Sequence, residues 1–354
     1  MFTKFTKIVL PIFVIAIFIL AGCGEKKATD VSHPSTVSII DDTGATIAIP
    51  AKITRIADAW PAHTEVLFLL GSGQNIVATN APAKTPWMLK INPSLANTTN
   101  IFGQTDVNVE ELLKSKPDII FMPGNMKNSK QLKELGLPAV QMNITDFDTL
   151  KSCIIATGKI LGPEASQRAS DYIFYLDQKI DLIQNRTRNI PNLQKPRILH
   201  ISSLKPLTVD GENSLISAWI TMAGGINAAK TDAPGSAEIS IEQLIKWNPD
   251  IIIFGNTALS ESSLSTILQD PSWQRLRAVQ NKAIYTNPEG MFYWDRYGVE
   301  EALQIQWAAK IFYPDKFSDI DLCQETQYFY QKFFNYTLSS EDAVAMLKGM
   351  PPAE

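Results

Sequence analysis

A long helical pattern near the middle of the chain divides it into two halves. From Glu164 to Arg188, apolar residues recur every three or four positions, which is the spacing of one buried helix face. Gly162 and Pro163 precede this pattern, and Pro191 follows it. The sequence therefore predicts one uninterrupted helix, about 37 Å long, which connects two structural units.

A cassette of fourteen residues before the pattern is repeated after it. Residues 107–120 read VNVEELLKSKPDII and residues 239–252 read ISIEQLIKWNPDII, with seven identical positions. In each copy Asn108 or Ser240 can cap a short helix, and a Pro-Asp pair then leads into an apolar strand. Strands and helices alternate on both sides of the connector. We therefore expect an α/β protein with two Rossmann-like lobes that contain parallel sheets.

Shorter signals place the remaining elements. Residues 37–49 alternate as in a β-hairpin, residues 147–161 form a helical pattern, and the segment 80–93 is irregular. We also expect helices over residues 272–279, 299–313 and 322–347. The predicted organisation is a signal segment (1–22), a tether (23–36), a first lobe (37–161), the connector (162–190), a second lobe (191–313) and a C-terminal helical extension (314–354).

The first 23 residues have the features of an export signal. Lys4 and Lys7 precede an apolar run of thirteen residues from Ile8 to Leu20, and Leu-Ala-Gly-Cys then ends at Cys23. A permanent membrane-spanning helix needs about 20 apolar residues, so a cleaved signal is the better interpretation. The Leu-Ala-Gly-Cys sequence resembles the bacterial lipobox, which implies that Cys23 carries acyl chains. An ordinary signal peptide with a chance cysteine is the alternative.

Composition and motifs exclude several classes of protein. The net charge of −4 and the dispersed Lys and Arg residues disfavour nucleic-acid binding. The sequence has no GxGxxG or GxxxxGKS/T phosphate loop and no GxSxG elbow, and its three histidines lack zinc-site spacing. We therefore expect no cofactor, and a membrane-tethered enzyme is the weaker hypothesis. Cys153 and Cys323 are either one disulfide or free thiols, with Cys153 on an apolar helix face.

Several of these features together resemble a class III substrate-binding protein of an ABC importer, the group of iron-siderophore, haem and vitamin B12 receptors. The resemblance rests on the lipobox-like segment, Arg55-Ile after the hairpin, the PAHTEVL segment at 61–67, both cassettes and the connector. It implies an extracytoplasmic monomer, tethered to the membrane through Cys23, that binds its ligand between the lobes and delivers it to a permease. The tail at 325–336 resembles an extension of iron-complex members. The expected ligand is therefore an iron complex or related metal chelate, with corrinoid, haem and metal-oxyanion ligands as alternatives.

Polar and aromatic residues at the carboxyl ends of the predicted strands mark the expected cleft. Residues 287–296 are the richest of these segments because they place aromatic rings beside a guanidinium. Arginine binds carboxylates in a bidentate manner and aromatic rings cover apolar ligand faces, so this set suits an anionic metal chelate. The candidate ligand-binding residues are Trp60, His63, Trp87, Asn125, Tyr293, Trp294 and Arg296. Capping a helix or filling a lobe interface is the alternative role for such residues, and anchoring a surface loop is the alternative for Trp87.

One exposed acid recurs in both cassettes. Glu110 and Glu242 occupy the second helical position of their cassettes and point away from the apolar face. The helix dipole and pairing with Lys114 or Lys246 would explain each acid separately, but not the recurrence. In the vitamin B12 and siderophore receptors that this chain resembles, each lobe presents a glutamate to permease arginines. We therefore expect Glu110 and Glu242 to contact the permease.

Overall fold

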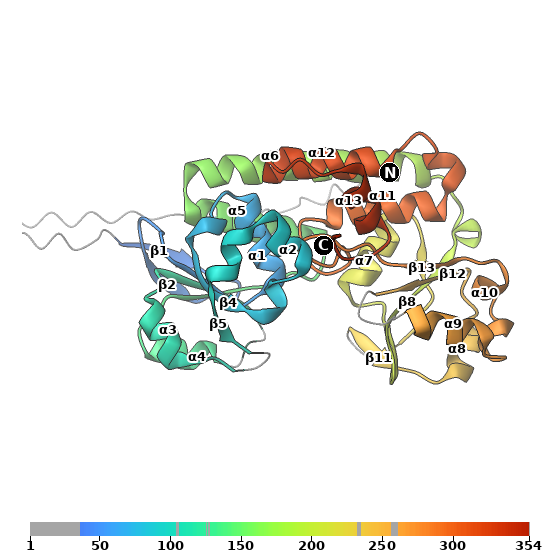
Figure 1. Cartoon of the computed structure of the whole chain (residues 1–354), viewed down its shortest axis with the longest axis horizontal. Coiled ribbons are helices and arrows are strands. Elements are labelled where there is room, and N and C mark those ends of the chain that lie inside the picture. Colours follow the sequence, from blue (N-terminus) through green and yellow to red (C-terminus); the bar gives the residue numbers. More distant parts are fainter. Residues whose placement is uncertain are drawn as a thin grey trace, which may run out of the picture.

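The structure is a computed structural model that describes residues 36–103, 106–124, 126, 128–231, 235–255 and 261–353. Two α/β lobes lie side by side under one long helix, α6 (Pro163–Thr187), as Figure 1 shows. This arrangement confirms the predicted fold class. Among the helices that the structure describes, none is long and apolar enough to cross a membrane.

The first lobe contains a five-stranded parallel sheet. Its strands are β3 (Ile56–Asp58), β4 (Ile76–Asn80), β5 (Thr99–Phe102), β6 (Ile119–Pro123) and β7 (Ala139–Met142), in the spatial order β5-β4-β3-β6-β7. Successive side chains of β6 enter two different apolar clusters, one on each face of the sheet. The predicted hairpin forms separately from β1 (Thr36–Ile40) and β2 (Thr46–Pro50).

The second lobe contains a mixed sheet. Its strands are β8 (Arg197–Leu204), β9 (Leu207–Asp210), β10 (Ile226–Asn227), β11 (Ser236–Glu238), β12 (Ile251–Phe254) and β13 (Ile284–Thr286). β10, β12 and β13 run parallel to β8, whereas β9 is antiparallel to β8 and pairs antiparallel with the edge strand β11. The expected parallel sheet is therefore present, with an additional antiparallel strand that the sequence does not predict, because the chain turns directly from β8 back into β9.

The remaining helices pack around the sheets. In the first lobe they are α1 (Pro61–Leu69), α2 (Pro86–Ile91), α3 (Val109–Ser115), α4 (Ser129–Glu134) and α5 (Phe147–Leu161). In the second lobe they are α7 (Leu215–Met222), α8 (Ile241–Trp247), α9 (Glu261–Gln269), α10 (Arg277–Gln280) and α11 (Glu301–Phe312). Short 3-10 turns are η1 (Gly73–Asn75), η2 (Ala81–Ala83), η3 (Pro93–Asn97), η4 (Asn192–Gln194), η5 (Trp273–Arg275) and η6 (Pro314–Phe317). The helix predicted over 272–279 is broken at Leu276, whose extended backbone separates η5 from α10.

Helix α6 contacts both lobes through one face. Its buried residues are Ala165, Ala169, Tyr172, Tyr175, Leu176, Ile180, Ile183 and Thr187, which include most of the apolar positions of the predicted period. α5 packs closely alongside because Gly158 has no side chain, and a Cβ there would lie 3.1 Å from the Ala169 Cβ. At its middle, the Tyr172 hydroxyl donates to Val299 O of the second lobe at 2.7 Å.

The chain ends in α12 (Leu322–Phe334) and α13 (Ser340–Leu347), which together with residues 348–353 we call the C-terminal strap. The helical pattern expected over 322–347 is present as two helices, because Asn335 adopts a left-handed conformation and ends α12. α12 runs along α6, where Glu325 pairs with Lys179 at 2.6 Å (Figure 1).

The C-terminal strap also reaches both lobes. In the first lobe, the Trp87 indole N–H donates to Met350 O at 2.9 Å. In the second lobe, the Glu289 N–H donates to Met346 O at 3.0 Å. The strap therefore connects the two lobes independently of α6.

The two cysteines in the described part of the chain are free thiols. Cys153 is buried in α5 with its Sγ 3.5 Å from the Met142 Sδ, and burial raises the pKa of this thiol. Cys323 lies in α12 and contacts Ser340 O. The disulfide alternative is therefore not realised.

Candidate functional site

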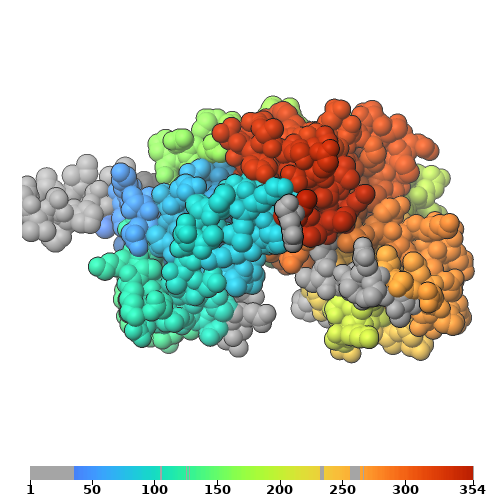
Figure 2. Space-filling view, in the orientation of Figure 1, coloured from blue at the N-terminus to red at the C-terminus, as the bar shows by residue number. Residues whose placement is uncertain are grey.

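A notch separates the two lobes on the side of the molecule opposite to α6 (Figure 2). The segments that follow β3, β4 and β13 meet at the boundary between the lobes. After β4, the Thr85 hydroxyl donates to Met291 O of the second lobe at 2.7 Å. The carboxyl ends of parallel strands are where open α/β sheets bind ligands, so this boundary is the candidate site.

Two aromatic rings from opposite lobes form the floor of the candidate site. Trp60, just before α1, lies 6.2 Å from Tyr297 between ring centroids, with their planes tilted by 56°. Both rings are partly exposed. Tyr297 has a φ of 61°, an unfavourable backbone conformation for a bulky residue. Such strain persists only where the surroundings enforce it, and it concentrates at binding sites.

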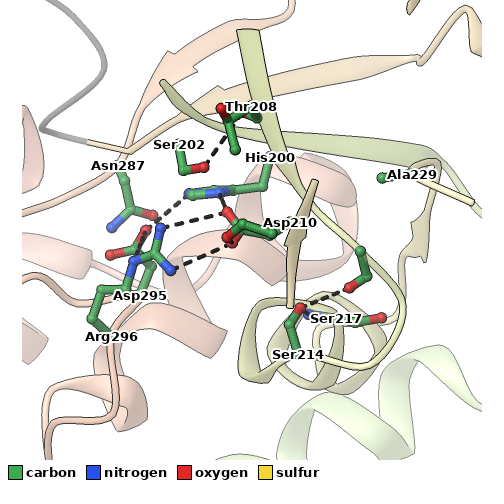
Figure 3. A network of polar contacts seen from close by, with 12 residues as sticks. His200, Ser202, Thr208, Asp210, Ser214, Ser217, Ala229, Asn287, Asp295 and Arg296 are labelled. Carbon is green, nitrogen blue, oxygen red and sulfur yellow. Dashed lines mark hydrogen bonds and ion pairs between the residues drawn. The ribbon is translucent and has the colours of Figure 1, made fainter. Parts of the chain in front are cut away.

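A charged network, shown in Figure 3, surrounds Arg296, the residue that precedes Tyr297 in the chain. His200 on β8 lies between two acids, with Nδ1 2.7 Å from Asp210 Oδ2 and Nε2 2.8 Å from Asp295 Oδ2. Asp210 also faces Arg296, whose Nη2 lies 3.4 Å from Asp210 Oδ2. The two aspartates and His200 are buried, whereas the Arg296 side chain keeps 26% of its surface exposed. Arg296 is therefore oriented by the acids and still accessible to a ligand.

Electrostatics inside this network are balanced. Burial alone would raise the pKa of Asp210, but His200 and then Arg296 hold it well below the usual range. The pKa of Asp295 is lowered in the same way, against burial, mainly by Arg296. For His200, burial opposes protonation, yet hydrogen bonds with the two acids raise its pKa. A protonated His200 and Arg296 thus face two carboxylates, which leaves Arg296 as a hydrogen-bond donor rather than an excess positive charge.

The corresponding cluster of the first lobe is closed to solvent. His63 is fully buried, with Nδ1 3.2 Å from Asp58 Oδ1 and Nε2 3.0 Å from the Thr157 hydroxyl. The Thr64 hydroxyl donates to the other Asp58 oxygen at 2.6 Å. The expectation that His63 contacts a ligand is wrong in this structure, because the ring has no exposed surface. It instead stacks behind Trp60, with centroids 6.4 Å apart, and so supports the floor.

Two predicted aromatic contacts are also corrected. Trp87 is fully buried in α2 beneath the C-terminal strap. Trp294 is likewise fully buried, and its indole N–H donates to Glu300 Oε1 at 3.0 Å. Neither ring has surface left for a ligand, so both residues are part of the interior.

The other predicted site residues divide into three groups. Tyr293 is partly exposed beside Phe292, with ring centroids 5.1 Å apart, and stays a candidate contact together with Trp60 and Arg296. Asn125 and Cys23 lie outside the described residues. Glu110 and Glu242 are exposed at matching positions of α3 and α8, and their contact with a permease stays a prediction.

Sequence reasoning missed several residues of this site. Asp295 and Tyr297 stand on either side of the predicted Arg296, and this adjacency was the signal that could have found them. Asp210 ends a strand that the sequence did not predict, so its place beside His200 could not be anticipated. Within the described residues, no group of three or more His, Cys, Asp or Glu side chains could hold a metal ion.

A second opening between the lobes lies beside the C-terminal half of α6. It is a groove of about 800 Å³ that is lined by residues 145–148, 181–188 and 212–224 together with Lys195. Its charged lining residues are Asp146, Asp148, Asp181, Glu212, Arg188 and Lys195. The acids outnumber the bases, so this groove lacks the chemistry expected for an anionic ligand.

Comparisons with known proteins agree with this geometry. A family model described as "Periplasmic binding protein" matches residues 56–290. The molybdate-binding protein MolA of Haemophilus influenzae is 23% identical, over 87% of this chain and 90% of its own length. An uncharacterized ABC transporter substrate-binding lipoprotein of Bacillus subtilis, YvrC, is 22% identical over 86% of this chain and 96% of its own length.

A solved structure gives the same result for the fold. The periplasmic solute binding protein from Veillonella parvula superimposes with a TM-score of 0.77 and 29% sequence identity. The match covers 89% of this chain and 97% of that protein. Both lobes and the connecting helix are thus shared.

Proposed function

We propose, from the premise that this chain belongs to the periplasmic binding protein family as a class III receptor of ABC importers, that its ligand is an anionic metal chelate. The family consists of substrate-binding proteins rather than enzymes. An iron complex is the leading candidate within this ligand class. The single observation that carries the proposal is the partly exposed Arg296 next in the chain to Tyr297, whose ring faces Trp60 of the other lobe.

The chemistry of these three groups favours a chelate over a bare anion. Asp210 and Asp295 already balance Arg296 and His200, so the site offers directed hydrogen bonds more than positive charge. A chelate presents carboxylate or catecholate oxygens to Arg296 and an organic face to Trp60 and Tyr297. A small oxyanion would use the guanidinium but leave both rings without a partner.

A metal oxyanion is the second candidate, and one observation favours it. MolA, whose name records molybdate binding, matches this chain over 87% of its length. In that case Arg296 and hydroxyl groups near the notch would supply the donors that an oxyanion needs.

Thermal stability in the presence of candidate ligands tests the proposal. A ligand that binds only the folded protein raises apparent stability by RT ln(1 + [L]/Kd). The panel contains catecholate and hydroxamate ferric siderophores, ferric citrate, haem, cobalamin, molybdate and tungstate. We expect a rise in Tm with a ferric chelate. A rise with molybdate or tungstate alone would contradict the chelate proposal and favour the oxyanion.

The same proposal places the protein outside the cytoplasm, on a lipid anchor at Cys23. It is supported by the export-signal features of residues 1–23 and by the lipoprotein named among the relatives. Replacement of Cys23 by Ser should move the protein from the membrane fraction to the soluble fraction and abolish labelling with palmitate. Continued labelling of Cys23→Ser would remove the anchor from this position.

Binding is expected to change the shape of the protein little. α6 joins the lobes as one continuous helix, and the C-terminal strap connects them a second time. Large hinge closures use a few flexible residues between domains. X-ray scattering with and without ligand should therefore give nearly equal radii of gyration.

A further inference from the structure

The segment that carries Tyr293, Arg296 and Tyr297 is bracketed by two glycines, and we call residues 290–298 the ligand loop. A Cβ at Gly290 would lie 1.8 Å from Glu300 Oε1, and a Cβ at Gly298 would lie 2.1 Å from Glu65 Oε2. Neither glycine has a positive φ. Glycine is therefore needed at both positions, because any larger residue would place its Cβ against a buried carboxylate.

Glu300 is the hydrogen-bond acceptor for the first half of the ligand loop. Its Oε1 accepts the indole N–H of Trp294 at 3.0 Å and the backbone N–H of Met291 at 3.3 Å. Its Oε2 accepts the backbone N–H of Phe292 at 3.0 Å. Glu300 is fully buried, so water does not compete for these bonds.

The C-terminal strap holds Glu300 in place. The Tyr330 hydroxyl of α12 donates to Glu300 Oε1, and its oxygen lies 3.2 Å from the Met291 N–H. Tyr330 is fully buried as well. The strap thus contacts the acceptor and the backbone that the acceptor orients.

The opposite lobe holds the other end of the ligand loop. Glu65 of α1 accepts the Val299 N–H at 2.9 Å. Burial and the neighbouring Glu300 raise the pKa of Glu65, and burial raises the pKa of Glu300. The other titratable groups that interact with this pair are Glu301, Tyr172 and Tyr330. The two neighbouring carboxyl groups therefore bind the backbone at the two ends of the loop, Glu300 at Met291 and Phe292 and Glu65 at Val299.

We propose that Glu300 and Glu65 are positioning residues of the ligand loop, and that Tyr330 makes the C-terminal strap part of the same device. The loop is fixed from three directions: its own lobe, the opposite lobe and the strap. Arg296 and Tyr297 point into the candidate site only while this device is intact. Only the statement that this loop binds a ligand rests on the proposed function. The positioning of the loop by Glu300, Glu65 and Tyr330 can be tested without a ligand.

Amide hydrogen exchange of the ligand-free protein tests the proposal. In Tyr330→Phe, the Met291 and Phe292 amides should exchange roughly tenfold faster, because one hydrogen bond that holds their acceptor is lost. The Trp294 indole resonance in a ¹⁵N-tryptophan spectrum, assigned with Trp294→Phe, should shift. Tyr328→Phe is the matched control, since Tyr328 lies on the same helix but is 49% exposed. Unchanged exchange and an unmoved indole resonance in Tyr330→Phe would overturn the proposal.

A second variant covers the case in which Tyr330→Phe unfolds. Glu300→Gln keeps one acceptor oxygen, which we place at the Oε1 position where several donors converge. Phe292 then loses its acceptor, so its amide alone should exchange faster while the Trp294 indole resonance stays. Equal acceleration of amides throughout the second lobe, or none at Phe292, would assign Glu300 a purely structural role. A failed ligand panel would remove the proposed function and leave this result unaffected.

Discussion

The two lobes are most alike where their central strands begin and least alike where these strands end. At the beginning, Asp118 and Asp250 each follow a proline and make the same contacts. The Asp118 N–H donates to Arg55 O, and the Asp250 N–H donates to Arg197 O, both at 2.8 Å. Each carboxylate in turn accepts a hydrogen bond from the backbone N–H of the same arginine at 2.9 Å. The repeated cassette therefore fixes the amino ends of both sheets in one way.

At the carboxyl ends the lobes differ in polarity and exposure. In the first lobe, Asp58 and His63 are satisfied by buried hydroxyl groups. In the second lobe, His200 and two aspartates lead to the partly exposed Arg296. The antiparallel edge formed by β9 supplies Asp210, and the first sheet has no such edge among its described strands. The repeated cassette therefore gives both lobes the same backbone arrangement at the start of a strand. The candidate site lies at the carboxyl ends of the strands, where the two lobes differ.

The largest expected effect tests whether the repeat also extends to partner recognition. Glu110→Lys combined with Glu242→Lys should abolish permease-dependent uptake, because acids on both lobes would meet basic pockets of the permease. Folding and ligand affinity should stay unchanged, since both side chains are exposed. Uptake in proteoliposomes is the measurement, and Glu134→Lys on exposed α4 is the control. Full uptake by the double variant would show that the repeated glutamates have no role in permease recognition and that the cassette serves folding alone.

The next effect separates the two carboxyl-end clusters. Arg296→Ala should weaken binding of the ferric chelate selected by the panel by about 1.5–3 kcal/mol, the scale of a charge-assisted hydrogen bond. Thr64→Val in the first lobe should instead lower the free energy of unfolding by about 1–2 kcal/mol and leave affinity unchanged. Titration calorimetry and urea unfolding measure the two quantities, with exposed Arg275→Ala as control. Equal loss of affinity in both variants would contradict the division of roles.

A pH dependence distinguishes the lobe junction from the network around Arg296. Burial raises the pKa of Glu65 and Glu301 well above the usual range and that of Glu300 to about 7. The folded protein therefore binds protons that the unfolded chain has lost, so the stability from these acids is complete below about pH 4.5 and falls as pH rises. Asp210 and Asp295 have lowered pKa values, so their contribution is present above about pH 4 and is lost on acidification.

Glu65→Gln isolates the junction. Glutamine keeps the acceptor for the Val299 N–H and has no titrating proton. From pH 5 to 8, the wild-type protein should lose on the order of 1–3 kcal/mol more stability than Glu65→Gln. Urea unfolding at both pH values measures this difference. Parallel pH profiles would show that Glu65 does not titrate with folding.

The smallest effect concerns the helix ends of the cassettes. Lys116 and Asn248 both end their helices in the left-handed conformation, with φ of 45° and 42°. Lys116→Gly should stabilise the protein by about 0.5–1 kcal/mol, because glycine adopts this conformation without strain. Asn248→Gly should give no gain, since the Asn248 side chain accepts the Arg277 N–H at 2.9 Å. Equal gains at the two positions would show that this hydrogen bond contributes nothing.

Local signals explain which parts of the fold could be predicted. α6, α5, β7 and β12 were predicted nearly to their boundaries, because their periodicity, caps and prolines lie within the elements themselves. β9 and β11 were missed, since short edge strands carry little apolar pattern. The break at Asn335 was also missed, because the residues on both sides of it have helical spacing.

The candidate site was less predictable because burial is decided by distant segments. An aromatic residue in a segment without regular pattern suggests an exposed ring. The C-terminal strap nevertheless covers Trp87, and the Glu300 carboxylate accepts the indole N–H of the buried Trp294. Glu65 lies in an apolar helix, and the residues around it in the sequence do not indicate which group its carboxylate binds. Its partner, Val299, is more than two hundred positions away. Arg296 was found because the aromatic cluster around it is contiguous in the sequence.

The hydrogen bond from Trp87 to Met350 spans 263 positions of the chain. A contact of such high sequence separation closes late in folding, because the intervening loop must first be ordered. A first lobe that folds as it emerges therefore leaves the Trp87 ring uncovered until residues 348–353 pack against it. The same strap carries Tyr330, so covering the tryptophan and completing the ligand loop belong to one step. A chain that lacks the C-terminal strap would expose the Trp87 ring and leave the ligand loop without its contact to Tyr330.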